Sequence, residues 1–280
     1  MEISTIGYWS EVKLEIIRKY AAAYSTIISG QKKPSFSHVY IDAFAGAGFH
    51  QAKKDGGLVW GSPLQALLID PPFKEYHFID LDREKIENLQ EIISTRNTDP
   101  FDPKHVHIYN DDCNNLLLEK IFPLIRYQDY RRALCLLDPY GLHLDWEVIQ
   151  KAGQMNTIEI FLNFPIYDMN LNVLKHNQTK VDPSQIERMN RYWGDESWRK
   201  AAYSTEDNLF GFEEKTNNER LAKGFQERLK RVAKFSFVPD PIPMRNSKGS
   251  IVYYLFFASQ KPAAAKIVKQ IFDKYRNYRP

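Results

Sequence analysis

VYIDAFAGAG, which runs from Val39 to Gly48, is the stretch of this sequence that decides the fold. A short apolar run leads into an acid and then into two glycines, Gly46 and Gly48. The run predicts a strand buried on both faces, and the glycines allow a tight turn in which the backbone can approach a ligand. The segment therefore predicts a strand that opens into a nucleotide-sized turn, with a purely structural turn as the alternative.

Asp42 is a charged residue inside this otherwise apolar strand, and Phe44 follows it in the turn. Burying an unpaired carboxylate is costly. Asp42 is therefore expected either to bind polar atoms of a ligand or to accept hydrogen bonds from backbone N–H groups of the turn.

Four more apolar runs follow along the chain, and each ends in a polar residue. The runs, with the residue that ends each, are 76–79 with Asp80, 106–109 with Asn110, 133–137 with Asp138 and 158–162 with Asn163. Because the carboxyl ends of parallel strands meet at one edge of a sheet, these polar residues are expected to line one ligand crevice. Asp82 and Asp112 lie just beyond two of the runs, and the alternative for them is that they cap the helices that follow.

Strand and helix patterns alternate up to residue 165, which predicts parallel βαβ units. Before the first strand, apolar residues recur at helical spacing over 9–29 and predict a helix. The polar segment 49–60 interrupts the usual junction between a glycine turn and its helix. It is interpreted either as a lid or substrate loop or as a solvated insertion.

The C-terminal part predicts a helix at 219–232 and then an antiparallel hairpin. Its two runs, 235–238 and 251–258, flank a turn at 246–249. Three prolines at alternate positions, Pro239, Pro241 and Pro243, remove N–H groups on one side of the first run. Only an edge strand tolerates that loss.

Taken together, these motifs resemble class I S-adenosylmethionine-dependent methyltransferases, and more closely the three-Cys-motif partner proteins of bacteria and phages. The residues that carry the closer resemblance are Trp9, Ser10, Lys13, Tyr20, Tyr40 to Gly48, Gly61-Ser62-Pro63-Leu64 and Leu137-Asp138-Pro139-Tyr140-Gly141. The resemblance covers residues 9–165, with a weaker part at 253–258. This family is named for a neighbouring protein with a three-cysteine motif, so the resemblance implies association with such a protein.

The expected fold class is α/β: a Rossmann-like class I methyltransferase domain spanning 1–280. It would have a seven-stranded, mostly parallel sheet of order 3-2-1-4-5-7-6, helices on both faces, and a helical insertion at 167–217 after the fifth strand. A dehydrogenase-type fold would have six parallel strands instead of the antiparallel end.

The resemblance also implies S-adenosylmethionine as the cofactor. Gly46 and Gly48 would pass under its methionine part, Asp80 would hold the ribose hydroxyls, and Asp112 with Cys113 would border the adenine. The full set of implied cofactor-binding residues is Asp42, Phe44, Gly46, Gly48, Asp80, Leu81, Asp112 and Cys113.

Asp138, Pro139 and Tyr140 are the catalytic residues that the resemblance implies. Enzymes that methylate amino groups carry Asn/Asp-Pro-Pro-Tyr/Phe at this place, where the acid and a proline carbonyl accept from the target amine and the ring stacks on a flipped base. This chain has one proline, and its tyrosine stands one position early, before Gly141. A turn fixed by Pro139 and Gly141 is the structural alternative.

Composition sets limits on the class of protein. The 280 residues include 43% hydrophobic ones, enough for a core, and no run approaches the ~20 apolar residues of a membrane span. No secretory signal is evident at the start of the chain, so a cytoplasmic protein is expected. Cys113 and Cys135 are expected to be reduced thiols, without a disulfide framework or a metal site. The net charge of +3 permits a nucleic-acid partner without requiring one.

The segment 167–217 mixes basic and aromatic residues, which suits contacts with phosphates and stacking on bases. The alternative is a small helical cap whose aromatic residues pack on the main core, because acids dilute the basic charge.

Three functions follow for testing. The first is an S-adenosylmethionine-dependent methyltransferase, with nucleic acid as the favoured substrate. The second is a cofactor-binding or non-catalytic subunit of a complex with a three-cysteine-motif protein. The third, a nucleotide-binding oxidoreductase, is disfavoured by the antiparallel end and by the lack of a compact Gly-x-Gly-x-x-Gly.

Overall fold

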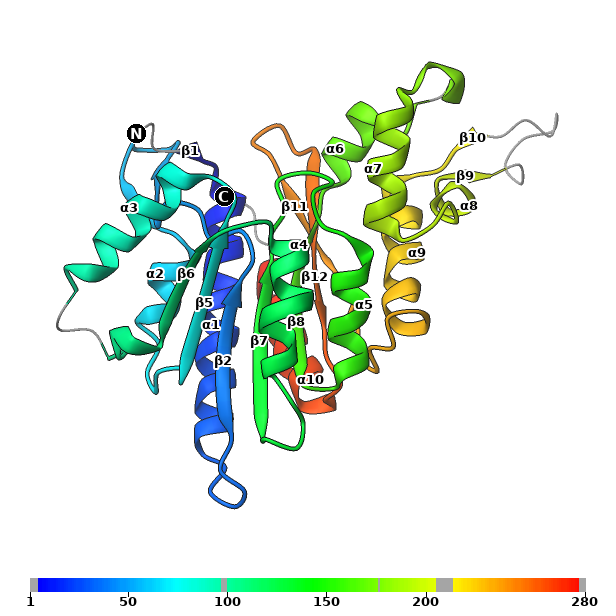
Figure 1. Ribbon diagram of the computed structural model, residues 1–280. Coiled ribbons are helices and arrows are strands. Elements are labelled where there is room, and N and C mark those ends of the chain that lie inside the picture. Colours follow the sequence, from blue (N-terminus) through cyan, green and yellow to red (C-terminus); the bar gives the residue numbers. More distant parts are fainter. Residues whose placement is uncertain (1–4, 97–99, 176, 205–213, 277–280) are drawn as a thin grey trace.

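The computed structural model describes residues 5–96, 100–175, 177–204 and 214–276 of the chain. Its centre is a seven-stranded sheet (Figure 1). From one edge to the other, the strands are β11 (Ile242–Arg245), β12 (Ile251–Ala258), β8 (Ile158–Phe164), β7 (Arg131–Leu137), β2 (Ser37–Asp42), β5 (Glu75–Asp80) and β6 (Val106–Asn110). The five strands from β8 to β6 are parallel, and β12 is antiparallel to both β8 and β11.

Numbered along the chain, these strands have the order 3-2-1-4-5-7-6 from β6 to β11, so the expected class I methyltransferase topology is confirmed. In the central strand β2, five of the six residues are buried, as its apolar sequence predicts for a strand covered on both faces.

Two layers of helices cover the sheet (Figure 1). One face packs against α1 (Tyr8–Ser29), α2 (Ser62–Leu67), α3 (Arg83–Ser94) and α10 (Pro262–Arg276). The other packs against α4 (Cys113–Leu116), which continues into a π-helical turn at Leu117–Ile121, α5 (Trp146–Met155), α7 (Pro183–Trp193) and α9 (Asn218–Arg231). Short 3₁₀ turns at Pro103–His105, Phe122–Leu124 and Gln178–Lys180 join these elements.

The segment 49–60 is not a loop. It forms a hairpin of β3 (Phe49–Ala52) and β4 (Leu58–Trp60), and β1 (Thr5–Ile6) adds to it in parallel. Gly56, with a φ of 72°, makes the reversal between the two strands possible. The hairpin places its first strand directly after the glycine turn.

The predicted antiparallel C-terminal hairpin is present, but its first strand lies later in the sequence than expected. β11 begins at Ile242, whereas the run 235–238 contributes only an isolated bridge between Phe237 and Ser259. Pro243 lies within β11, at the edge of the sheet, as its missing N–H requires. Pro239 and Pro241 precede the strand.

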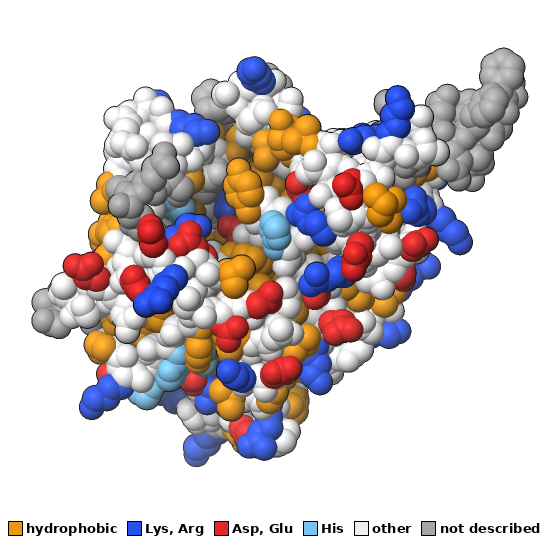
Figure 2. Space-filling model, turned by 45° about the horizontal axis from the view of Figure 1, so that its top comes forward, with side chains coloured by type: hydrophobic (Ala, Val, Ile, Leu, Met, Phe, Trp, Pro, Cys, Tyr) orange, Lys and Arg blue, Asp and Glu red, His pale blue; other side chains and the backbone are white. Residues whose placement is uncertain are grey.

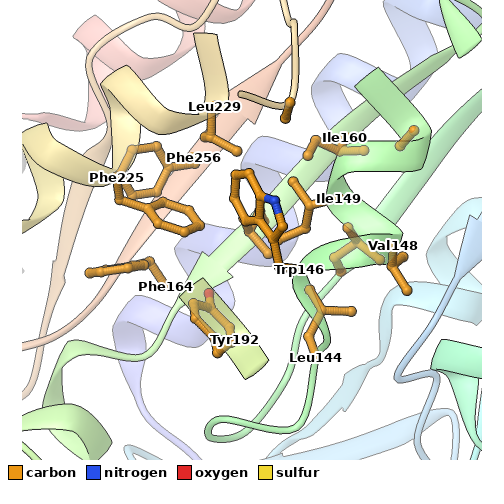
Figure 3. Close-up of a cluster of buried hydrophobic side chains, with 14 of the residues drawn as sticks. Leu144, Trp146, Val148, Ile149, Ile160, Phe164, Tyr192, Phe225, Leu229 and Phe256 are labelled. Carbon is orange, nitrogen blue, oxygen red and sulfur yellow. The ribbon is translucent and has the colours of Figure 1, made fainter. Parts of the chain in front are cut away.

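The segment after β8 contains α6 (Ile166–Asn172), α7 and α8 (Trp198–Ala202), followed by the short strand pair β9 (Tyr203–Ser204) and β10 (Glu214–Lys215). Tyr192, Trp193 and Trp198 are buried in the main core. Figure 3 shows Tyr192 of α7 beside Phe164 of β8 and Phe225 of α9, and Phe225 in turn lies against Trp146 of α5. These aromatic residues therefore pack on the core, as the second interpretation of the segment holds.

Candidate active site

The carboxyl ends of the parallel strands lie at the top of Figure 1, and Figure 2 brings this end forward. The chain builds the sheet outward from β2 in both directions, first to β5 and β6 and later to β7 and β8. Open α/β sheets bind ligands at such a switch point. In Figure 2 this face is hollowed, with hydrophobic, acidic and basic side chains around the hollow.

The glycine turn lies directly against Asp80 at the end of β5. Oδ2 of Asp80 accepts from the Gly46 N–H at 2.8 Å, and its Oδ1 accepts from the Asp82 N–H at 2.9 Å. Gly46 has a φ of 66°, and no atom lies within 4 Å of the position that a Cβ would take. The turn thus needs glycine for its backbone and leaves open space over it.

Asp42 is fully buried at the end of β2. Its Oδ2 accepts from Ser62 Oγ at 2.5 Å, and its Oδ1 accepts from the Phe44 N–H at 3.2 Å. Burial raises the pKa of Asp42 to about 7, although these two hydrogen bonds act in the opposite direction. Of the two roles expected for Asp42, the structure shows the hydrogen bond from the turn.

Asp112 and Cys113, the two residues expected around the adenine, follow the end of β6. Asp112 caps α4 by accepting from the Asn114 N–H at 2.7 Å. The structure thus shows the capping contact that was the alternative for this residue. Asp82 likewise caps α3. Leu81 is 73% exposed, and Cys113 is buried. Burial raises the pKa of the Cys113 thiol to about 12, which keeps it protonated and unreactive.

Asp138, at the end of β7, pairs with Lys13 of α1 through its Oδ2. The side chains are 11% exposed for Lys13 and 21% for Asp138. Burial by itself lowers the pKa of Lys13, but the carboxylate of Asp138 outweighs it and the pKa lies above its usual range. Lys13 is therefore a cation in the site.

The turn after Asp138 is fixed on both sides. Asn163 Nδ2 donates to the Pro139 carbonyl at 3.0 Å, and Asp168 of α6 accepts from the Leu142 N–H at 3.3 Å. The Asn163 amide is buried, and its Oδ1 has no hydrogen-bond partner in the described part of the chain. Tyr140, between these anchors, is 98% exposed.

Tyr253 of β12 completes this cluster. Lys13 Nζ lies 5.2 Å from the centre of its ring, and the Tyr253 hydroxyl donates to the Trp9 carbonyl at 3.4 Å. Trp9, Lys13, Asp138 and Tyr253 all belong to the residues that carried the family resemblance, and the fold brings them together. No local pattern indicated that Lys13 faces Asp138, because 125 positions separate them.

His50 of β3 is a further residue that sequence reasoning missed. Burial and the nearby charge of Lys13 lower its pKa, so its imidazole is neutral near pH 7. Its Nε2 would lie 3.4 Å from a Cβ added to Gly61, which places it at the start of α2. The sequence did not indicate it because the segment 49–60 was interpreted as a loop or an insertion, with none of its residues assigned to the site.

Three arginines of the segment 167–217 are engaged by acids. Arg188 pairs with Asp168 at 3.6 Å, Arg191 with Asp145 at 2.7 Å, and Arg199 with Glu196 at 3.7 Å. These pairs fix the helices to one another and to the turn after β7. Their charge is thereby partly neutralised within the protein.

Among the described residues, no group of three or more His, Cys, Asp or Glu side chains is arranged to hold a metal ion. Cys113 and Cys135 are both buried free thiols. In the same part of the chain, no helix has the length and apolar composition needed to cross a membrane.

No family model and no curated protein match this sequence. Solved structures do. A Legionella pneumophila protein described by the family model DUF519 is 10% identical with a TM-score of 0.49, covering 95% of this chain and 92% of that one. A proposed S-adenosylmethionine-dependent methyltransferase from Listeria monocytogenes is 12% identical with a TM-score of 0.42, covering 81% and 92%. The methyltransferase domain of the bacterial protein CtHen1 is 9% identical with a TM-score of 0.41, covering 87% and 99%.

Proposed function

We propose that this protein is an S-adenosylmethionine-dependent methyltransferase that acts on nucleic acid. The observation that carries the proposal is the pairing of Asp80 with the Gly46 turn at the switch point of a sheet with methyltransferase topology. A partly exposed carboxylate beside an open glycine turn is suited to ribose hydroxyls.

The charge of the site suits the sulfonium of this cofactor. Asp42, Asp80 and Asp138 end the three adjacent strands β2, β5 and β7, and each of the other two carboxylates contributes to the raised pKa of Asp42. Lys13 offsets part of this negative charge. Methyl transfer from a sulfonium mainly requires alignment of the acceptor with the methyl group. The open space over Gly46 and the rigid turn after Asp138 supply two fixed sides for that alignment.

Nucleic acid is favoured by Tyr140. A ring that is 98% exposed, on a turn held by Asn163 and Asp168, is a pre-formed platform for stacking on a base. Within this function, Asp138, Pro139 and Tyr140 border the acceptor, and the open turn at Gly46 borders the cofactor.

Membership of the three-Cys-motif partner family is part of the same proposal. It is supported by the convergence of Trp9, Lys13, Asp138 and Tyr253 in one cluster, since residues shared for a common site are expected to meet. Co-expression with a three-cysteine-motif protein, followed by gel filtration, tests whether the two form a complex. Elution of the two proteins as separate peaks would contradict this partner.

Replacing Asp80 by alanine is expected to weaken S-adenosylmethionine binding by about 1.5–3 kcal/mol, the range for hydrogen bonds to a charged group. Isothermal titration calorimetry measures the effect, with Asp102→Ala as the matched control, since Asp102 caps the turn before the amino end of β6. Equal affinities in wild type and Asp80→Ala, with both folded, would rule out this cofactor contact.

Replacing Tyr140 by alanine is expected to weaken nucleic-acid binding by about 1–3 kcal/mol while leaving S-adenosylmethionine affinity unchanged. Fluorescence anisotropy with labelled single-stranded oligonucleotides measures the first quantity, and calorimetry the second. Tyr167→Ala is the control, because Tyr167 of α6 is also exposed, at 48%, but lies outside the turn. An unchanged oligonucleotide affinity in Tyr140→Ala would remove the stacking role.

A further inference from the structure

The hydrogen bonds around Asp138 restrict which kind of acceptor atom the site can take. A target amino group is a hydrogen-bond donor, and the turn after β7 would offer it two acceptors, the Asp138 carboxylate and the Pro139 carbonyl. Both already receive donors from this chain: Lys13 Nζ binds Asp138 Oδ2, and Asn163 Nδ2 binds the Pro139 carbonyl at 3.0 Å. These two bonds leave Asp138 Oδ1 as an acceptor, so what distinguishes an amine from a hydroxyl here is the Lys13 cation beside the carboxylate, which repels N–H groups and donates to oxygen.

Lys13 is not placed to leave Asp138 easily. Its side chain is 11% exposed and lies over the ring of Tyr253. The Tyr253 hydroxyl in turn donates to the carbonyl of Trp9 in α1. Separating the pair would leave two largely buried charges unpaired, which is costly. The Lys13–Asp138 pair is therefore a fixed part of the site that an acceptor meets.

An ammonium group has three N–H donors in total, and one of them reaches Asp138. A second can point at an oxygen atom of the acceptor, which offers lone pairs. A neutral amino nitrogen would instead meet the cation with its own N–H groups. The donor character of the site thus favours oxygen over an exocyclic nitrogen.

We propose that the methyl acceptor is a hydroxyl oxygen, held by Lys13 and deprotonated by Asp138. This inference rests on the proposed methyltransferase function and deepens it. Lys13 Nζ donates to the hydroxyl oxygen and stabilises the negative charge that develops on it, while Asp138 Oδ1 receives the hydroxyl proton.

The proposed step balances in atoms and charge. A C–O bond forms between the acceptor oxygen and the methyl carbon as the C–S bond of S-adenosylmethionine breaks. The sulfur keeps the electron pair and becomes the neutral thioether of S-adenosylhomocysteine. The hydroxyl proton moves to Asp138 and then to water, which restores the carboxylate.

In an internal nucleotide the phosphodiester bonds occupy the 3′ and 5′ oxygens, so the ribose 2′-hydroxyl is the free hydroxyl. It is also the group that distinguishes RNA from DNA. The inference therefore assigns RNA as the substrate among nucleic acids, with the methyl group on the ribose and not on the base.

The test is transfer of a tritiated methyl group from S-adenosylmethionine to pooled RNA, with pooled DNA in parallel, followed by digestion to nucleosides and chromatography. Label on 2′-O-methyl nucleosides from RNA is the expected result. Label on a base, or transfer to DNA, would overturn the hydroxyl assignment while leaving the methyltransferase function intact. Binding of S-adenosylmethionine without label in either pool would also overturn it. Absence of S-adenosylmethionine binding in calorimetry would instead overturn the proposed function itself, and the inference with it.

Lys13→Met is expected to lower kcat about a hundredfold, the effect of removing one donor to a developing oxyanion, with S-adenosylmethionine affinity retained. Lys19→Met on the same helix is the matched control, because Lys19 contacts Glu15 and Tyr275, away from Asp138. Equal turnover in Lys13→Met would show that Lys13 takes no part in the transfer, and higher turnover would show that it blocks an acceptor site. Either result would overturn the proposal.

A double variant guards against loss of folding in Lys13→Met. Lys13→Met with Asp138→Asn removes both charges of the pair and leaves no unpaired buried charge. It is expected to fold, to bind S-adenosylmethionine and to have turnover at least as low as Lys13→Met. Wild-type turnover in the double variant would overturn the assignment of both residues.

Discussion

Replacing Asp42 by asparagine is expected to remove a decline in stability that the wild-type protein shows between about pH 4 and pH 7. The native pKa of Asp42 is about 7, because the carboxyl group is buried, whereas an unfolded aspartate titrates near 3.9. Between these values the native state binds the proton and the unfolded state does not. Its contribution is therefore fully present below about pH 4 and is lost as the pH rises through about 7.

The size of this effect follows from the pKa difference of about 3 units, which corresponds to about 4 kcal/mol. Asparagine imitates the protonated acid: its Oδ1 can accept from the Phe44 N–H, and its Nδ2 can donate to Ser62 Oγ. Urea unfolding of both proteins at a series of pH values measures the difference in their free energies of unfolding. That difference is expected to shift in favour of the Asp42→Asn variant by about 4 kcal/mol between pH 4 and pH 8.

Ser62→Ala is the matched control with the opposite sign. The Ser62 hydroxyl donates to Asp42 Oδ2 and lowers its pKa, so losing it is expected to raise the pKa and extend the decline to higher pH. Parallel stability curves for wild type, Asp42→Asn and Ser62→Ala would show that Asp42 has no raised pKa in the native state.

The central strands could be predicted from the sequence because each is an apolar run that ends in a polar residue. β2, β5 and β7 finish within one residue of the predicted Asp42, Asp80 and Asp138. A strand that is buried on both faces needs apolar residues at successive positions, so a continuous apolar run is enough to predict it. The position of Pro243 similarly identified the edge of the sheet.

The contacts of the site could not be predicted, because they depend on long-range packing. Lys13 meets Asp138 only after α1 has packed across the sheet, and Asn163 meets Pro139 only after β8 has paired with β7. The turn after β7 was expected to offer acceptors to a target amine. In the structure each of these two acceptors already receives one donor, from α1 and from β8, which no spacing within the motif could indicate.

Local polarity also left the interpretation of two segments open. Residues 49–60 are polar, yet backbone pairing of β3 with β4 and β1 orders them into a small sheet. In 167–217, basic residues interleaved with aromatic ones allowed either a surface for nucleic acid or a small helical cap packed on the core. There the aromatic side chains of Tyr192, Trp193 and Trp198 are buried, and sequence alone does not show which face of a helix the core covers.

Replacing Phe225 by alanine is expected to destabilise the protein by about 3–5 kcal/mol, the cost of truncating a large buried aromatic residue. Phe225 of α9 is fully buried. Its ring lies 4.7 Å from that of Phe164 in β8 and 5.5 Å from that of Phe256 in β12. It also stacks on Tyr192 of α7 at 5.8 Å (Figure 3).

The effect is expected to be large because this ring joins the sheet to the segment that follows β8. Truncation would leave a cavity among several aromatic rings, and rigid rings collapse poorly into such a space. Loss of the packing would also loosen α7, whose Arg188 pairs with the Asp168 that holds the turn of Tyr140. Phe225→Ala is therefore expected to weaken oligonucleotide binding as well as folding.

Denaturant unfolding measures the loss of stability, with Tyr140→Ala as the control for an aromatic residue that is 98% exposed. The control is expected to unfold within about 0.5 kcal/mol of wild type, as is usual for surface substitutions. A loss below about 1 kcal/mol in Phe225→Ala, well under the range for a buried aromatic residue, would mean that α9 does not pack on β8 and β12 as described. The buried aromatic residues of α7 belong to the same core. Removal of the whole segment 167–217 is therefore expected to cost more stability than Phe225→Ala. Retained stability in such a deletion would show that the segment folds apart from the sheet.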